Sequence, residues 1–194
     1  MQQKIKLDDK GSEIIFIPNF IDEHFCQQLY QELTDPNIPW IQGEYNMYGK
    51  TVKTPRLLCA MCNTDFDIKK SYNITGAIIW TDNVKKLRDM INVYTNKNIQ
   101  YAQLNRYRNG NDYIGLHADK EMNLEDIIAS ISLGATRKFV LVNKNDKHDR
   151  HSIDLPSGSL LIMNDKAGKI YWKHAIPKNT SVDKERINIT FRPA

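Results

Sequence analysis

The sequence predicts an α+β, mainly β fold with two sheets and with helices packed on one outer face. Two observations support this class. Apolar residues recur at helical spacing only in the first half of the chain, whereas short strand-like segments separated by turn residues fill the second half. At 194 residues the chain is expected to form a single domain, with helices and covering loops at about 1–98 and the β core at about 99–194.

The first predicted elements are a short apolar strand within residues 11–20 and a helix of about three turns. Asp22 is the candidate N-cap of this helix. The apolar residues that follow at helical spacing are Phe25, Cys26, Leu29 and Leu33. Pro36 and Pro39 are expected to end the helix, because proline cannot continue the hydrogen-bond ladder.

Residues 42–75 are polar, aromatic and basic without steady periodicity, so we expect hairpins and loops that cover a site. A second helix is predicted after the candidate cap Asp82. Its apolar residues at helical spacing are Val84, Leu87, Met90, Ile91 and Tyr94. This helix is expected to support a sheet.

Strands are predicted from Ile99 onward. The first of them places three polar side chains on one face, namely Gln103, Asn105 and Tyr107. The elements expected after it are a turn at 109–112, a strand pair or bend around Gly134 within 129–142, a charged connection at 144–152, and strands at 159–163 and 186–192.

Composition limits the class of protein. The formal charge of +4 is mildly basic, which is compatible with a polyanionic partner but does not demand one. Cations interleave with Tyr48 and Tyr72, as on many nucleic-acid surfaces, although a solvated face has the same pattern. The apolar runs are too short to span a bilayer and the N-terminus lacks a signal-peptide core. We therefore expect an intracellular monomer, cytoplasmic or nuclear, that does not bind membranes.

Most of the cysteines and histidines have ordinary structural interpretations. The three cysteines make an odd count, which does not suggest a disulfide framework. Cys59 and Cys62 have the spacing of a zinc or redox pair, but no second pair accompanies them. A lone histidine is more often structural than a ligand, which applies to His24, His148 and His151.

His117, Asp119 and His174 are different. In extended backbone His117 and Asp119 point to the same side, and His174 comes from a distant strand. Two imidazoles and one carboxylate are the ligands of a non-haem Fe(II) oxygenase, which keeps open positions for an oxo-acid and dioxygen. The alternative is a surface His–Asp pair with an unrelated histidine.

The last predicted strand supplies candidate residues for binding the oxo-acid. Alternate residues of a strand face the same way, so one face carries Arg186, Asn188, Thr190 and Arg192. The opposite face carries Ile187, Ile189 and Phe191, which suits a site wall backed by a core. Because guanidinium groups bind carboxylates bidentately, this strand suggests a carboxylate cosubstrate such as 2-oxoglutarate.

Together these segments resemble the successive motifs of the AlkB family of iron- and 2-oxoglutarate-dependent nucleic-acid dealkylases. The matching segments are NRYRNG (105–110), IGLHADKE (114–121), SISLGATRKF (130–139), GSLLIMN (158–164), HAIP (174–177) and RINITFR (186–192). The resemblance implies a double-stranded β-helix (jelly-roll) core, two N-terminal helices packed on one sheet, and a nucleotide-recognition lid.

The resemblance also implies residue roles. It assigns His117, Asp119 and His174 to catalytic Fe(II). It assigns a further set to the 2-oxoglutarate pocket, with Arg186 as the salt-bridge partner of the distal carboxylate: Asn105, Tyr107, Arg186, Asn188, Thr190 and Arg192. Glu121 matches an acidic residue that the family places between Arg192 and the substrate base.

The first half of the chain looks most like the branch of the family that repairs double-stranded DNA. The segments that resemble its finger hairpin and substrate lid contribute the expected substrate contacts Tyr48, Gly49, Lys50, Arg56, Tyr72, Asn73 and Ile74. Two departures put the preferred lesion in doubt. Ile74 stands where relatives carry a stacking aromatic, and residues 61–63 stand where an aromatic–glycine pair is common.

The resemblance predicts oxidative demethylation of N1-methyladenine and N3-methylcytosine in DNA, with Fe(II), 2-oxoglutarate and O2. The products are formaldehyde, succinate and CO2. Three alternatives stay open at this point: an RNA demethylase on the same scaffold, a hydroxylase of protein or small molecules, and an inactive nucleic-acid-binding module.

Overall fold

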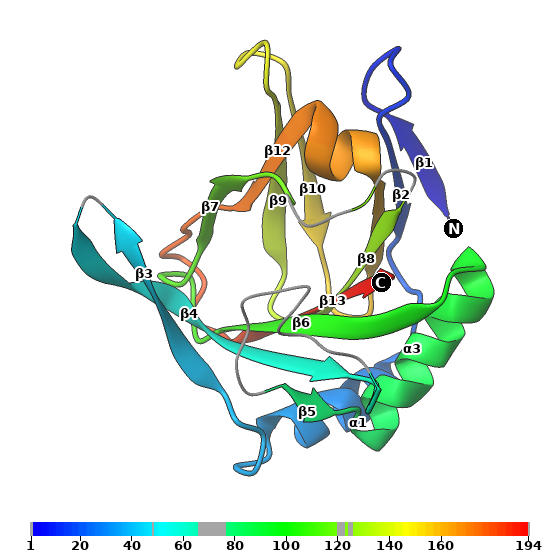
Figure 1. The fold of residues 1–194 in the computed structure, drawn as a ribbon, viewed down its shortest axis with the longest axis vertical. Coiled ribbons are helices and arrows are strands. Elements are labelled where there is room, and N and C mark those ends of the chain that lie inside the picture. Colours follow the sequence, from blue (N-terminus) through cyan, green and yellow to red (C-terminus); the bar gives the residue numbers. More distant parts are fainter. Residues whose placement is uncertain (1, 48, 66–76, 120–122, 124–125, 194) are drawn as a thin grey trace.

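Two antiparallel sheets form the body of the protein in the computed structural model (Figure 1), which describes residues 2–47, 49–65, 77–119, 123 and 126–193. Within these ranges, nine strands belong to a large sheet and four to a small one. A cluster of buried side chains contributed by both sheets fills the space between them. The predicted jelly-roll fold is confirmed.

The large sheet runs in the order β1 (Gln3–Lys6), β2 (Glu13–Ile17), β11 (Leu160–Asn164), β8 (Ile127–Gly134), β13 (Arg186–Pro193), β6 (Ile99–Tyr107), β4 (Lys50–Cys62) and β3 (Ile41–Met47). The short β5 (Ile78–Ile79) pairs with β4 in parallel. The small sheet runs in the order β10 (Arg150–Leu155), β9 (Arg137–Asn143), β12 (Trp172–Ile176) and β7 (Ile114–His117).

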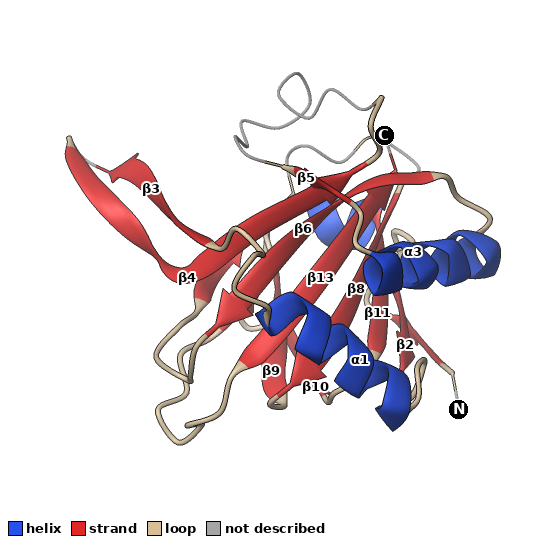
Figure 2. Cartoon of the chain, turned by 90° about the horizontal axis from the view of Figure 1, so that it is seen from below, coloured by secondary structure: helices blue, strands red, loops and turns tan. Residues whose placement is uncertain are grey.

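Helices α1 (Glu23–Thr34) and α3 (Asp82–Thr95) both cover the outer face of the large sheet (Figure 2). Apolar residues of both helices share one cluster with the outward side chains of β13 and β6, which include Ile187, Ile189 and Phe191. The apolar face of the last strand, which was predicted to form the core behind the site wall, is therefore buried under the helices. The opposite face of the sheet is free to build a site.

The caps of the two helices differ. Asp22 is the N-cap of α1, as predicted, and its side chain accepts a hydrogen bond from the Phe25 amide at 2.8 Å. The prediction that Asp82 caps α3 is wrong, because Thr81 occupies that position and makes no capping bond itself. The Glu32 carboxylate of α1 accepts from the Asn83 amide at 3.1 Å instead. A cap supplied by a neighbouring helix leaves no local pattern in the sequence.

Several segments are more regular than predicted. Residues 42–62, expected as loops and hairpins, include most of the β3–β4 hairpin, and β4 continues into the large sheet by pairing with β6. The region around Gly134, which has φ +82°, is a bend and not a hairpin, because β8 and β9 lie in different sheets. The charged connection is shorter than expected, since β10 begins at Arg150. In the described part of the chain, no helix is long and apolar enough to cross a bilayer.

An unpredicted π-helix, η1 (Lys166–Ile170), precedes β12. Single turns of π-helix occur often at functional sites. The Gly168 carbonyl of η1 accepts a hydrogen bond from the Asp119 amide at 3.0 Å. This bond ties the chain just beyond β7 to the end of β11 and the start of β12.

Candidate active site

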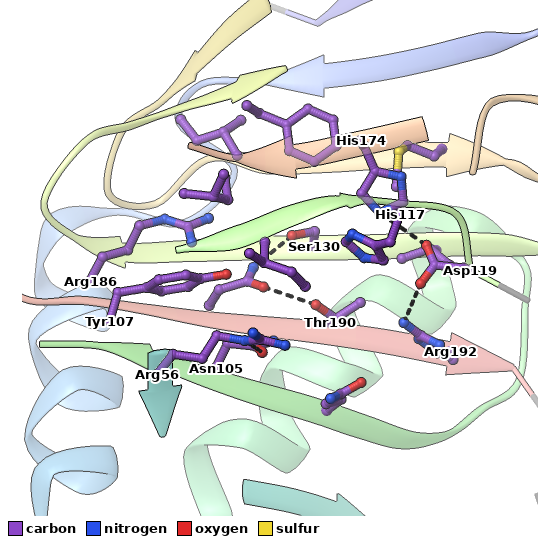
Figure 3. Close-up of a pocket in the computed structure, with 18 of the residues that line it drawn as sticks. Arg56, Asn105, Tyr107, His117, Asp119, Ser130, His174, Arg186, Thr190 and Arg192 are labelled. Carbon is purple, nitrogen blue, oxygen red and sulfur yellow. Dashed lines mark hydrogen bonds and ion pairs between the residues drawn. The ribbon is translucent and has the colours of Figure 1, made fainter. Parts of the chain in front are cut away.

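A cavity of about 520 Å³ lies between the two sheets, on the side of the large sheet that the helices leave uncovered (Figure 3). Ten of the residues expected in a site line it: Arg56, Asn105, Tyr107, His117, Asp119, His174, Arg186, Asn188, Thr190 and Arg192. The predicted alternation along the last strand is confirmed, because the four polar residues of β13 face the cavity. The cavity wall also has apolar members: Ile114, Ile128, Phe139, Leu155, Met163 and Ile176.

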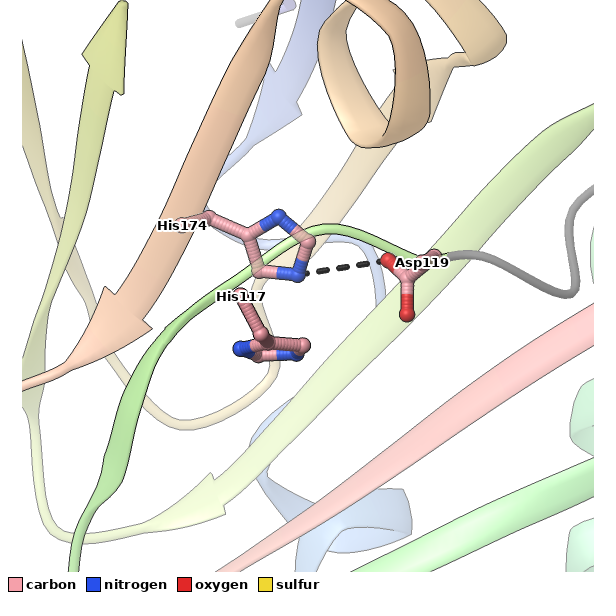
Figure 4. Close-up of side chains that lie close together, drawn as sticks. All are labelled: His117, Asp119 and His174. Atoms are coloured by element: carbon pink, nitrogen blue, oxygen red, sulfur yellow. Dashed lines mark ion pairs between the residues drawn. The ribbon is translucent and has the colours of Figure 1, made fainter. Parts of the chain in front are cut away.

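His117, Asp119 and His174 meet at one end of this cavity (Figure 4). His117 ends β7 and pairs across the small sheet with His174 of β12, so the two rings lie 4.3 Å apart. Asp119 follows two residues after β7, where its amide bonds to η1. One ligand atom from each residue lies within 4.8 Å of the other two.

The surroundings of the two imidazole rings favour metal binding. His117 Nδ1 lies 2.9 Å from the Gly115 carbonyl oxygen, which can only accept, so Nδ1 carries the proton and Nε2 is left as the ligand. Burial and the neighbouring His174 lower the pKa of His117, which favours the neutral form that binds metals. The Phe139 ring stacks on His174 at 5.4 Å and fixes its orientation.

Asp119 is held as a carboxylate. His174 Nε2 lies 3.2 Å from one carboxylate oxygen, and Arg192 Nη2 donates to the other at 2.8 Å. Burial alone would raise the pKa of Asp119, but the hydrogen bond and charge of His174, with the charge of Arg192, lower it to about 2. Two imidazole side chains and one ionised carboxylate fit a divalent iron ion with open positions.

The opposite end of the cavity is built around Arg186, which is 1% exposed. Its Nη2 donates to the Ser132 hydroxyl at 2.8 Å, whereas its Nε and Nη1 have no hydrogen-bond partner among the described residues. Burial lowers the pKa of Arg186, yet a guanidinium stays charged in proteins. Buried guanidinium N–H groups with no partner among the described residues are suited to a carboxylate, so this end fits the distal carboxylate of 2-oxoglutarate.

The polar residues between the two ends are bonded to one another. Asn188 Nδ2 donates to the Ser130 hydroxyl at 2.7 Å, and the Thr190 hydroxyl donates to Asn188 Oδ1 at 3.0 Å. Arg56 of β4 reaches into the cavity and donates from Nε to Asn105 Oδ1 at 2.7 Å. Arg56 was expected among the substrate contacts near the hairpin, and its side chain lies beside Asn105 in the cavity (Figure 3).

Arg192 lies at the metal end of the cavity. The resemblance groups it with the 2-oxoglutarate residues, and its hydrogen bond joins it to Asp119. Arg186 and Arg192 thus face the same cavity from the same strand but have different partners. Periodicity predicted their common face and carried no information about which group each would meet.

The remaining substrate predictions fall mainly on the hairpin and the lid. Gly49 has φ +75° at the hairpin tip, a left-handed conformation that suits glycine, and Lys50 beside it is exposed. The other expected substrate contacts lie outside the described residues: Tyr48, Tyr72, Asn73, Ile74 and Glu121.

Sequence reasoning missed some participants. Ser130 and Ser132 stand at alternate positions of β8 inside a quoted motif, so period-two alternation could have indicated them. Buried Arg137 carried no such signal. The Cys59 and Cys62 side chains belong to two different buried clusters, on opposite sides of β4, so they do not form a site together.

Comparisons with known proteins agree with this geometry. The 2OG-Fe(II) oxygenase superfamily matches residues 13–192. The chain is 30% identical over 183 residues to DNA oxidative demethylase ALKBH2 of Bos taurus, covering 86% of this chain and 64% of that protein. It is 31% identical to the Mus musculus protein of the same name, covering 86% and 74%.

One solved structure, titled "The structure of OsALKBH1", superposes with a TM-score of 0.69 at 16% identity and covers 100% of both chains. At that identity the likeness shows the fold alone. The chain spans about two thirds of the length of the curated relatives that it matches.

Proposed function

The chain belongs to the 2OG-Fe(II) oxygenase superfamily and, within it, to the AlkB family, and we propose that it is an oxidative demethylase of alkylated bases in DNA. The family implies Fe(II), 2-oxoglutarate and O2 as cofactor and cosubstrates. The observation that carries the proposal is the joint placement of a two-His, one-carboxylate set and a buried guanidinium at the two ends of one cavity. The relatives named as DNA oxidative demethylases support DNA as the substrate.

In this proposal each end of the cavity has its own task. His117, Asp119 and His174 hold the iron, and the Arg192 contact keeps the Asp119 carboxylate oriented. Arg186 binds the distal carboxylate of 2-oxoglutarate, with Tyr107 beside it. An iron ion held by these residues would, with its cosubstrates, supply the oxidation of an N-methyl group.

The chemistry balances without a further co-reactant. One oxygen atom of O2 enters succinate as 2-oxoglutarate loses CO2, and the other converts the N-methyl group to N-hydroxymethyl. The C–N bond then breaks, its electron pair stays on the base nitrogen, the hydroxyl proton is lost to solvent, and formaldehyde leaves. The apolar wall that includes Ile114, Phe139 and Ile176 keeps bulk water from the reacting groups.

The substrate side follows the family resemblance. N1-methyladenine and N3-methylcytosine are the proposed lesions, and the resemblance assigns their contacts to Tyr72, Asn73, Ile74 and Glu121. We propose that residues 1–98 supply this recognition unit within one domain. Exposed Lys50 and Lys53 on the hairpin are placed to meet phosphates, whereas Arg56 acts inside the cavity.

Formaldehyde release from matched DNA and RNA oligonucleotides tests the proposal. Each oligonucleotide carries one N1-methyladenine or N3-methylcytosine, and the Asp119→Ala variant provides the blank. We expect release from DNA that depends on iron and 2-oxoglutarate. Faster release from RNA would favour the alternative demethylase, and no release from either polymer would overturn the proposed function.

Tyr48 provides a prediction about duplex substrates. A base inside a duplex must be extruded at a cost of a few kcal/mol, and a side chain must fill the gap that it leaves. Tyr48 adjoins the glycine at the hairpin tip and exposed Lys50, which is the composition of such a wedge. Tyr48→Ala should slow demethylation of duplex DNA by on the order of tenfold and leave the single-stranded rate nearly unchanged.

The comparison needs an aromatic control far from the hairpin. Tyr94 on α3 is 40% exposed on the helical side of the large sheet, so Tyr94→Ala should leave both rates close to those of the wild type. Equal losses on duplex and single strand in Tyr48→Ala would refute the wedge role.

A further inference from the structure

Arg137 is a buried cation that lies next to the cavity without lining it. It is the first residue of β9 and is 2% exposed. Its Nη2 donates to the carbonyl oxygens of Pro177 at 2.8 Å and Asp112 at 3.0 Å, and its Nη1 donates to that of Asn109 at 3.3 Å. All three acceptors are backbone groups, so Arg137 fixes chain positions rather than side chains.

The three carbonyls belong to two loops that connect the strands of the site. Residues 108–113 join β6 to β7, and residues 177–185 join β12 to β13. One loop therefore connects Tyr107 to His117, and the other connects His174 to Arg186. A single guanidinium holds both connections between the iron ligands and the cosubstrate end.

These loops also contact each other closely. The Gly110 amide donates to the Val182 carbonyl at 2.7 Å, and the Gly110 carbonyl accepts from the Asn179 amide at 2.8 Å. A Cβ on Gly110 would lie 1.7 Å from the Asn179 carbonyl oxygen. With so little space between the loops, a shift of one loop displaces the other. Arg137 donates hydrogen bonds to both loops and so restrains both.

The charge of Arg137 is not neutralised by a carboxylate. The Asp112 carboxylate binds Arg108 at 2.8 and 2.9 Å, and Arg137 contacts only the Asp112 backbone oxygen. In the described ranges neither Arg137 nor Arg186 forms an ion pair. Both guanidinium carbons lie near the Tyr107 ring, at 5.6 Å for Arg137 and 5.2 Å for Arg186.

We propose that Arg137 is a positioning residue that selects a dicarboxylate cosubstrate: it orients Tyr107 and the two loops around Arg186, and its charge strengthens the attraction for a distal carboxylate. The inference rests on the proposed function, because it assumes that Arg186 receives that carboxylate. The Arg137 guanidinium carbon lies 5.6 Å from the Tyr107 ring and is buried, so screening of its charge by water is weak.

Two ligands distinguish this role from a purely structural one. 2-Oxopentanoate has the same oxo-acid head and five-carbon chain as 2-oxoglutarate, with a methyl group in place of the distal carboxylate. Isothermal titration of each ligand into the Mn(II)-loaded protein gives a ratio of dissociation constants. In Arg137→Gln the preference for 2-oxoglutarate should fall by about tenfold, mostly through weaker binding of the dicarboxylate.

Arg137→Lys keeps the charge without the planar fork, so its preference should fall by a smaller factor, roughly threefold. The KM for 2-oxoglutarate should rise in both variants with kcat nearly unchanged. Lys178→Gln is the matched control, because it removes an exposed cation from the 177–185 loop and should keep the wild-type ratio.

An unchanged ratio in a folded Arg137 variant overturns the proposal, as does equal weakening of both ligands. Failure of both variants to fold would assign Arg137 to the fold alone and overturn it as well. A wild-type protein that does not prefer 2-oxoglutarate would instead refute the proposed function, so the two failures are distinguishable.

Discussion

Arg186 and Arg192 project from the same face of β13 into the same cavity, yet only Arg192 has a carboxylate partner within the described residues. Arg192 donates to the Asp119 carboxylate at 2.8 Å, so its charge is compensated within the protein. Arg186 contacts a serine hydroxyl and lies over the Tyr107 ring, with the charge of Arg137 nearby. At the metal end the charges of Arg192 and Asp119 compensate each other. At the cosubstrate end, Arg186 and Arg137 leave an excess of positive charge.

This difference explains how one strand can serve two ligands. An arginine that is already paired with a metal-ligating carboxylate orients that ligand and presents little net attraction for another anion. Buried guanidinium groups with no carboxylate partner attract a dicarboxylate strongly, because burial without compensation is costly for them. The two ends should therefore respond differently to the same kind of substitution.

The largest effect is expected at the metal end. His117→Ala, Asp119→Ala and His174→Ala should each reduce formaldehyde release to the enzyme-free background, because two remaining ligands hold iron poorly. All three variants should stay folded, as judged by circular dichroism. Asp119→Ala should melt at the lowest temperature, since it also removes the group that Arg192 contacts. Undiminished turnover in Asp119→Ala would contradict the iron assignment.

Arg186→Lys tests the other end. A point charge replaces a bidentate fork, and losing a charge-assisted hydrogen bond is worth roughly 1.5–3 kcal/mol, or tenfold to a hundredfold in affinity. The half-saturating concentration of 2-oxoglutarate should rise by that factor with iron held saturating. A half-saturation point equal to that of the wild type would remove Arg186 from the pocket.

Arg192→Lys is the same substitution six positions later on the same face, and it should have the smallest effect. Iron affinity should fall on the order of tenfold, because residues that orient a metal ligand contribute at that level. The half-saturating concentration of 2-oxoglutarate should change less than in Arg186→Lys. A shift as large as that of Arg186→Lys would break the contrast between the two ends and return Arg192 to the cosubstrate pocket.

The sequence by itself determined what depends on neighbours along the chain. The Asp22 cap, the two helices, the alternation of polar and apolar residues on the last strand, and the glycine turn of the hairpin follow from local hydrogen bonding and side-chain periodicity. The residue types of His117, Asp119 and His174 likewise indicated metal chemistry before their distances were known.

Only the tertiary structure decided which groups meet. Glu32 caps the second helix, Arg56 turns into the cavity, and Arg192 rather than Arg186 contacts Asp119. Arg137 reaches three carbonyls in two loops that are far apart in sequence. Periodicity fixes the face on which a side chain lies, but the partner across the cavity depends on sheet register and on the packing of one sheet against the other, and neither is encoded in a local pattern.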